Sequence, residues 1–250
     1  LTLFNYLFHI YSVFLLKNFN CNPKCLSYII RRVFGLGFIK EIPPFIDFTP
    51  RKELLKDTSY ILDQLPEKQD QNVLIEDITG VKCDNCVDAA TVAHDLEEKH
   101  HGRVFISAIH PHILGFYTSP WTGGKDFRTQ EGTNIVKELI GEPLGLPAGS
   151  INRIHFPGQT LVSMQEGWWP KYVNDLIAQK ADVNLSVDLK KDKEQRKVTA
   201  TVKATYLEEQ TAPMYLTVLI TESHIINPQR TEKGKKEDYE HNYVLRKAVT

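Results

Sequence analysis

The spacing of apolar residues along the chain predicts a repeated strand–helix pattern in residues 72–165. The runs at 73–78 and 104–109 are short, almost wholly apolar and rich in β-branched residues, which is typical of buried strands. Residues 83–101 lie between them and carry an apolar stripe at helical spacing, which ends at Gly102. Strand, helix and strand at this separation predict a βαβ unit with a parallel strand pair.

The same region predicts further elements, and the pattern changes after Ala181. We expect a helix near 134–140, strands near 150–156 and 160–165, and a helix around 170–180. Beyond Ala181, apolar and polar residues alternate with a period of two along three stretches. A charged turn at 190–197 joins the first two of them. This alternation predicts an antiparallel sheet with one solvated face, as in an immunoglobulin-like β-sandwich whose set of strands is incomplete at residue 250.

Candidate chemistry lies where the first strand gives way to the first helix. Cys83 and Cys86 enclose only two residues at this point. The free N–H groups and the partial positive charge of a helix N-terminus stabilise a thiolate, which makes a cysteine there a nucleophile. The second sulfur lies one helical turn further on, so Cys83 would attack a disulfide and Cys86 would resolve the mixed disulfide. Asp84 opposes thiolate formation by its like charge, which predicts a more reducing couple.

A proline supplies the second sign of a thioredoxin-like domain. In such folds a cis-proline precedes the strand that faces the dithiol, and Leu146-Pro147 occupies that place in chain order. We therefore predict Cys83, Cys86 and Pro147 as catalytic residues and Leu146 as a substrate-binding residue. The predicted organisation is a leader and linker at residues 1–50, a thioredoxin-like α/β domain at 51–181 and the β-sandwich at 182–250.

The N-terminal segment differs in composition from the rest of the chain. Residues 1–40 contain five basic residues and no Asp or Glu, and their first sixteen residues are mostly apolar. This run has about the length of a signal-peptide core, although no basic segment precedes it and no small-residue cleavage site follows it. We predict an exported protein with a signal-like leader, and a permanent membrane anchor is the weaker alternative. Prolines at 43, 44 and 50 then predict an extended linker.

Charge and cysteine spacing exclude several classes of protein. The 30 basic and 31 acidic residues give a net charge of −1, whereas a nucleic-acid-binding domain needs a basic excess. The cysteines form two close pairs, Cys21/Cys25 in the leader and Cys83/Cys86. No second pair of ligands stands at a zinc-site spacing in the globular part, so we predict neither a metal nor a cofactor.

Several separated motifs, in order, resemble the outer membrane protein 28 family of Gram-negative envelopes. The resemblance covers roughly residues 41–249 and rests on the stretches at 41–48, 73–86, 126–129, 145–153 and 239–246. It implies an exported, surface-associated protein, often a lipoprotein, with a thioredoxin-like domain followed by a β-sandwich. Two positions depart from the family pattern: Lys40 stands where a lipid-carrying cysteine is expected, and Val87 where proline usually follows the second cysteine.

Several other positions carry a chemical hypothesis beside a simpler one. Glu76 is either a buried proton acceptor for Cys86 or a solvent-facing acid at a strand end. His110 and His112 either tune the dithiol or bind a metal, or they are exposed imidazoles. Trp168 and Trp169, with Tyr172, form either an aromatic ligand platform or core packing between the two domains.

Two functions follow from these residues. The first is an envelope-associated protein that is exported to the outer membrane or cell surface. It would act in binding or assembly through a thioredoxin-like scaffold, with envelope proteins or surface ligands as partners. The alternative is a thiol–disulfide oxidoreductase that uses Cys83 and Cys86 on envelope proteins. The disulfide would be structural in the first case, as is common in exported proteins.

Overall fold

The computed structural model describes residues 8–11, 61–192, 194–195, 197–209 and 215–248. The predicted leader and linker lie outside the described residues except for the short strand at residues 8–11, as do Cys21 and Cys25. Their proposed roles stay predictions.

A mixed sheet of six strands forms the centre of the described structure, in the order β1–β7–β10–β3–β2–β4. Strand β2 pairs in parallel with β3 over its whole length and antiparallel with β4. Helix α1 connects β2 to β3, so the predicted βαβ unit is confirmed. The strand bounds are Phe8–Tyr11 (β1), Val73–Ile78 (β2), Val104–Ile109 (β3), Ala148–Ile151 (β4), Leu219–Glu222 (β7) and Val244–Ala248 (β10).

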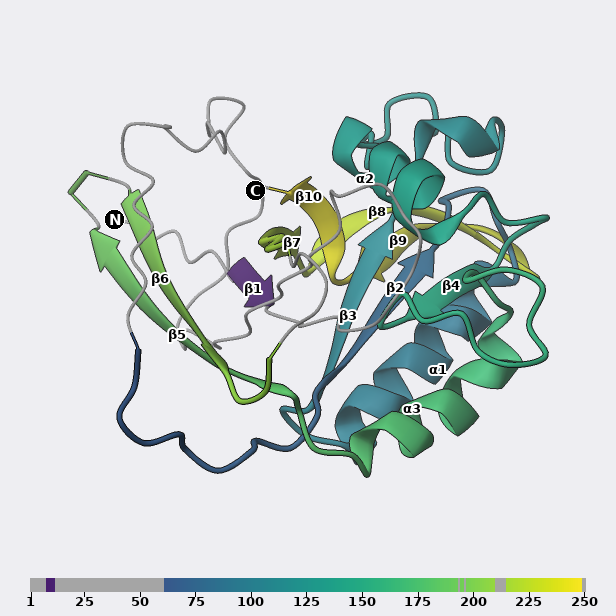
Figure 1. The fold of residues 1–250 in the computed structure, drawn as a ribbon. Helices are drawn as coiled ribbons and strands as arrows, with labels where there is room; N and C mark the ends of the chain where they lie inside the picture. Colours follow the sequence, from purple (N-terminus) through teal and green to yellow (C-terminus); the bar gives the residue numbers. More distant parts are fainter. Residues whose placement is uncertain (1–7, 12–60, 193, 196, 210–214, 249–250) are drawn as a thin grey trace.

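Helical segments cover both faces of this sheet, so the fold has three layers (Figure 1). Helices α1 and α3 pack on the face that carries Val73 and Ile75, while η3 packs on the face that carries Leu74 and Ile78. Because both faces are covered, every residue of β2 and β3 is buried, as their continuous apolar runs predicted. The helical segments are α1 (Cys86–Lys99), η2 (His112–Leu114), α2 (Gln130–Asn134), the π-helical η3 (Ile135–Ile140), η4 (Glu166–Trp168) and α3 (Trp169–Ile177).

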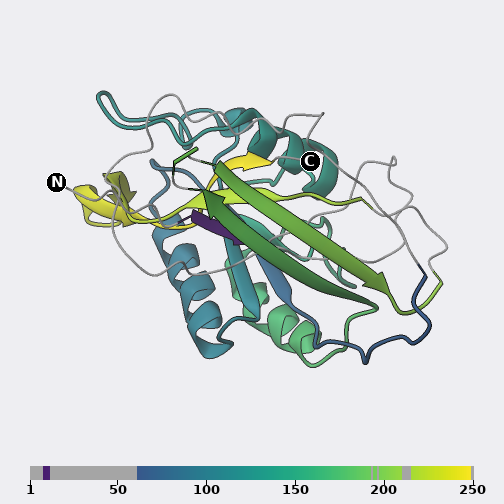
Figure 2. The same ribbon diagram turned by 90° about the vertical axis from the view of Figure 1, so that its left-hand side faces the viewer.

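The strands after Ala181 form two hairpins and also extend the central sheet. Strands β5 (Val183–Asp192) and β6 (Lys197–Tyr206) make one long antiparallel hairpin, seen at the front in Figure 2. Strands β8 (Ile225–Thr231) and β9 (Gly234–His241) make a second hairpin. Strand β10, in contrast, pairs antiparallel with β7 and parallel with β3.

The immunoglobulin-like β-sandwich is therefore not confirmed. The period-two alternation correctly indicated antiparallel strands, but β7, which overlaps the third alternating stretch, completes the sheet of the α/β unit together with β10. Alternation reports that one face of a strand is buried and does not report which sheet buries it. The described structure is mixed α/β, with the central sheet and two small antiparallel sheets.

The predicted strands at 150–156 and 160–165 are shorter than expected. Strand β4 ends at Ile151 because Asn152 and Arg153 both adopt left-handed backbone conformations, with φ of 49° and 52°. In place of the second predicted strand, Met164 forms a single antiparallel bridge with Gly149. The chain turns after Ile151 because the side chains of residues 152 and 153 bond back to β2.

Candidate functional site around the Cys83–Cys86 disulfide

The two predicted cysteines form a disulfide at the start of α1. The S–S distance is 2.02 Å and the Cα atoms lie 5.4 Å apart. Cys86 is the first residue of the helix, and Asn85 occupies the N-cap position. Sequence spacing therefore placed the pair correctly at the junction of strand and helix.

Both cysteines are nevertheless buried, each with 2% of its surface exposed. A redox-active pair at a helix N-terminus needs an accessible sulfur. The disulfide of this structure is thus closed to a protein substrate.

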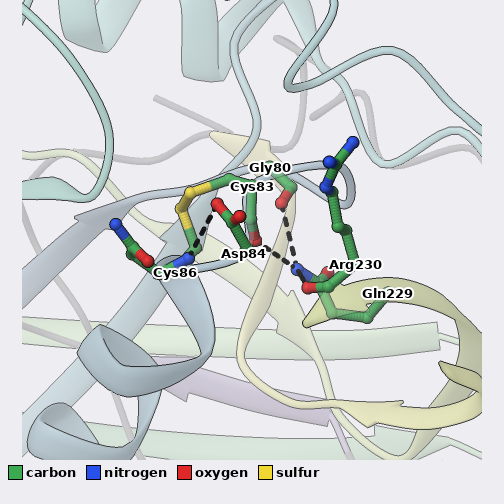
Figure 3. The surroundings of a disulfide bond; sticks show 7 residues. Gly80, Cys83, Asp84, Cys86, Gln229 and Arg230 are labelled. Atoms are coloured by element: carbon green, nitrogen blue, oxygen red, sulfur yellow. Dashed lines mark hydrogen bonds between the residues drawn. A yellow bond between two sulfur atoms is a disulfide. The ribbon is translucent and has the colours of Figure 1, made fainter. Parts of the chain in front are cut away.

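The β8–β9 hairpin holds the backbone of the loop at residues 80–86 that contains the two cysteines, here called the CxxC loop. The Gln229 side chain donates hydrogen bonds to the carbonyl oxygens of Cys83, at 2.8 Å, and Gly80, at 3.3 Å (Figure 3). The backbone N–H of Arg230 donates to the carbonyl of Val81 at 2.9 Å, and the Arg230 side chain points away from the sulfur atoms. The segment 80–83 is therefore fixed by residues almost 150 positions away. No local pattern in the sequence signals this contact.

Pro147 lies at the same end of β2 as the disulfide. The Leu146–Pro147 peptide bond is cis, and β4 begins at the next residue. Ala148 pairs with Ile78, the last residue of β2, and the CxxC loop follows five residues later. Leu146 is half-buried and packs against the core on the η3 face of the sheet. The catalytic roles of Cys83, Cys86 and Pro147 and the substrate-binding role of Leu146 stay predictions.

Asp77 is a buried acid that the sequence reasoning overlooked. It lies on β2, six residues before Cys83, and is 2% exposed. Burial, helped by the charge of Glu166, raises the pKa of Asp77 to about 8. Its Oδ1 atom has no hydrogen-bond partner within the described part of the chain. Strand alternation could have found it, because Val73, Ile75 and Asp77 occupy the same face, the one that α1 covers.

Glu76 fits neither of the two hypotheses for it. Its side chain is fully buried and accepts hydrogen bonds from Arg153 Nε at 2.8 and 3.0 Å, from Arg153 Nη2, and from Ser150 Oγ at 2.9 Å. An acid with four such contacts and a guanidinium partner is a structural ion pair. Arg153 reaches it because of its left-handed backbone after β4.

His110 is buried, contrary to the simpler hypothesis of an exposed imidazole, whereas His112 is exposed. The His110 ring packs edge-on against Phe127, and Phe127 packs in the same way against His241 of β9. Burial lowers the pKa of His110 to about 3, helped by the charges of His241 and Arg246, and burial lowers the pKa of His241 to about 4. No group of three or more His, Cys, Asp or Glu side chains in the described ranges is arranged to hold a metal ion.

The tryptophan pair divides between core and surface. Trp169 is fully buried and packs with Tyr172 in the core under α1 and α3. Trp168 is 47% exposed and its ring stacks at 6.1 Å from that of Tyr172. Trp169 therefore packs in the core of the α/β unit and not between two domains as predicted, and the pair does not form one shared platform.

Comparison with known proteins finds a family match for the C-terminal part of the chain. Residues 142–250 match a family of outer membrane proteins. The family is the one described as outer membrane protein Omp28, so the predicted resemblance is confirmed over this segment, which begins just before β4. No curated protein and no solved structure matches the chain.

The family assignment agrees with the predicted export to the outer membrane or cell surface. Among the described residues, none of the helices has the length and apolar character needed to cross a membrane. The matched segment contains the β8–β9 hairpin, so Gln229 lies within it, whereas the residues that Gln229 bonds, Gly80 and Cys83, lie before it.

Proposed function

We propose that this chain is an outer-membrane or surface-associated protein in which a thioredoxin-like unit serves as a rigid scaffold for binding or assembly at the envelope. The observation that supports this proposal is the closed disulfide, with both cysteines 2% exposed and the CxxC loop bonded to Gln229. A buried disulfide on an exported protein stabilises the fold without needing an electron donor. Envelope proteins or surface ligands are the proposed partners.

The thioredoxin-like assignment rests on four features at one end of the sheet. They are the parallel β2–β3 pair, the CxxC at the start of α1, the antiparallel β4 next to β2 and the cis-proline before β4. The added strands β7 and β10 on the other side of β3 extend this unit. The arrangement supports a scaffold in which the C-terminal strands and the α/β unit are one body.

A redox titration combined with a turnover assay tests the proposal. We expect the Cys83–Cys86 couple of the full chain to have a reduction potential below about −300 mV against glutathione or dithiothreitol, with no catalysed reduction of insulin. The Cys83→Ser variant should then equal wild type in the insulin assay. Insulin turnover that disappears in Cys83→Ser would overturn the scaffold role.

One observation favours the second candidate, a thiol–disulfide oxidoreductase. Asp77 is buried without a partner for Oδ1 on the sheet face that α1 covers, and its raised pKa of about 8 suits a group that exchanges protons near neutral pH. In this mechanism the Cys83 thiolate attacks a substrate disulfide and releases the first substrate thiol. Cys86 gives its proton to Asp77 and attacks the Cys83 sulfur, which releases the second thiol and restores the disulfide.

The oxidoreductase candidate has its own test. Asp77→Asn should slow resolution of the mixed disulfide below pH 8 while leaving the first attack unchanged. Quenched-flow capture of the mixed disulfide separates the two steps. A variant that resolves the intermediate at the wild-type rate across pH 6–8 would eliminate Asp77 as the proton acceptor.

A further inference from the structure

Large aromatic side chains are exposed beside the CxxC loop. Phe116 and Tyr117 have 58% and 52% of their surfaces exposed, and their rings meet edge to face with centroids 6.0 Å apart. Trp121, on the same loop, is half-buried and donates its indole N–H to the carbonyl of Val81 at 3.2 Å. Neighbouring exposed aromatics are characteristic of surfaces that bind a partner.

Two lysines lie against these rings, and an arginine is the cross-strand partner of one of them. The Lys82 ammonium lies 5.0 Å from the centroid of Phe116 and 5.3 Å from that of Trp121. The Lys235 ammonium lies 4.9 Å from the centroid of Trp121. Lys235 of β9 is also the cross-strand partner of Arg230 in β8, so two like charges stand opposite each other.

The positive charge of this surface is only partly balanced. Glu237 forms an ion pair with Lys235 at 2.7 Å, and the Asp84 carboxylate accepts the N–H of Asn85. Neither Lys82 nor Arg230 forms an ion pair with a carboxylate within the part of the chain that the structure describes. An anionic partner would relieve the repulsion between the cations.

The surface is also held in place before any partner arrives. The backbone N–H of Lys82 donates to the carbonyl of Tyr117 at 2.9 Å, and its ammonium donates to Ser119 at 3.0 Å. A Cβ atom on Gly80 would lie 2.3 Å from the same Tyr117 carbonyl. The loop that carries Phe116, Tyr117 and Trp121 is therefore in close backbone contact with the CxxC loop. Binding to such a surface has a small ordering cost.

We infer that this aromatic–cationic patch binds acidic polypeptide segments that also carry aromatic or aliphatic side chains. The patch consists of Lys82, Phe116, Tyr117, Trp121, Arg230 and Lys235. The 75° angle between the rings of Phe116 and Tyr117 gives an angular apolar surface that suits side chains of a peptide and offers no flat platform for a sugar ring. The inference rests on the proposed binding function and specifies the chemistry of the partner.

Binding of synthetic polymers to the full chain tests this inference. The probes are a random glutamate–tyrosine copolymer, polyglutamate, a polyuronate and vesicles that contain anionic lipid. We expect the copolymer to bind several-fold more tightly than polyglutamate, and the preference to disappear in Phe116→Ser/Tyr117→Ser. The Lys82→Gln/Arg230→Gln variant should weaken copolymer binding by about tenfold, the sum of two surface charge contacts.

A variant of equal net charge is the matched control. Lys190→Gln/Lys191→Gln removes two exposed cations from β5, outside the patch, and should leave the affinity within about twofold of wild type. Equal losses in both charge variants, no binding of the copolymer, or tighter binding of the polyuronate or the vesicles would overturn the inference. The scaffold function is tested separately by the redox assay. A disulfide without insulin turnover would still support the scaffold function even if the binding experiment failed, so failure of the binding inference and failure of the proposed function are distinguishable.

Discussion

The buried carboxyl group of Asp77 gives the sharpest prediction. Its pKa is raised to about 8 in the folded protein, whereas an unfolded aspartate titrates near 3.8. Between these values the folded state holds one proton more than the unfolded state, so the free energy of unfolding decreases as the pH rises. Asp77→Asn keeps the shape of the protonated acid and removes this dependence.

The size of the effect follows from the pKa values. Each pH unit in this interval costs about 1.4 kcal/mol, so the charge on Asp77 lowers the free energy of unfolding by roughly 6 kcal/mol once the pH reaches 8. The folded pKa values of His110 and His241, about 3 and about 4, have the opposite consequence. The unfolded histidines bind protons below pH 6.5, so stability is lost as the pH falls from 6.5 to 4.

Wild-type stability should therefore be highest near pH 6.5 and fall by about 2 kcal/mol between pH 6.5 and pH 8. Asp77→Asn should not show this fall. At pH 8 the variant should exceed wild type by about 3–5 kcal/mol, after subtraction of roughly 1–3 kcal/mol for an amide that lacks a partner. Urea denaturation followed by the fluorescence of the buried Trp169 measures both quantities.

The control for this prediction is Asp188→Asn, which alters an exposed acid on β5 and should follow the wild-type pH profile. A wild-type protein whose stability stays constant or rises from pH 6.5 to pH 8 would refute the reasoning. The same conclusion would follow if Asp77→Asn were less stable than wild type at pH 8.

Three further substitutions probe the packing around the site. Gln229→Ala removes the hydrogen bonds to two buried carbonyl groups and should lower the free energy of unfolding by about 1–3 kcal/mol. Amide hydrogen exchange in β8 and β9 should become faster, and unchanged exchange would contradict the contact. Gly149→Ala places a Cβ atom 2.5 Å from the Trp169 ring and should cost at least about 1–3 kcal/mol in urea denaturation, whereas Gly145→Ala meets nothing within 4 Å and should be nearly neutral. Arg153→Gln leaves the buried Glu76 carboxylate without its partner and should lower the free energy of unfolding by about 3–5 kcal/mol, which a lower Tm would show. A loss below about 1 kcal/mol would contradict the ion pair.

Local patterns predicted the elements whose form depends only on nearby residues. Strands β2 and β3 occupy the expected residues because a strand buried on both faces must be apolar throughout. The cysteines were placed correctly at the start of α1, since strand, turn and helix follow each other directly in the chain. The β5–β6 hairpin was likewise evident from its alternation and charged turn.

Features that depend on distant residues were missed or misassigned. The contact between Gln229 and the CxxC loop joins residues 146 positions apart, and nothing near either one indicates it. Glu76 was considered either as a buried proton acceptor or as a solvent-facing acid, but it is buried and paired with Arg153. The acid whose Oδ1 has no hydrogen-bond partner within the described residues is its neighbour Asp77. Strand β7 had the pattern of a separate sandwich because a strand with one buried face alternates in the same way in either sheet, and no alternation had been noted at β10.

The position of β10 has a consequence for how the protein is made. Strand β3 ends at Ile109, but its neighbour on one side, β10, begins about 135 residues later at Val244. At about 5–20 residues per second, a ribosome needs roughly 7–27 s to synthesise that interval, during which the edge of β3 is unpaired. A central sheet that stays open during synthesis delays compaction of the chain, which would suit the export proposed above because an exported chain crosses a membrane more readily before it folds.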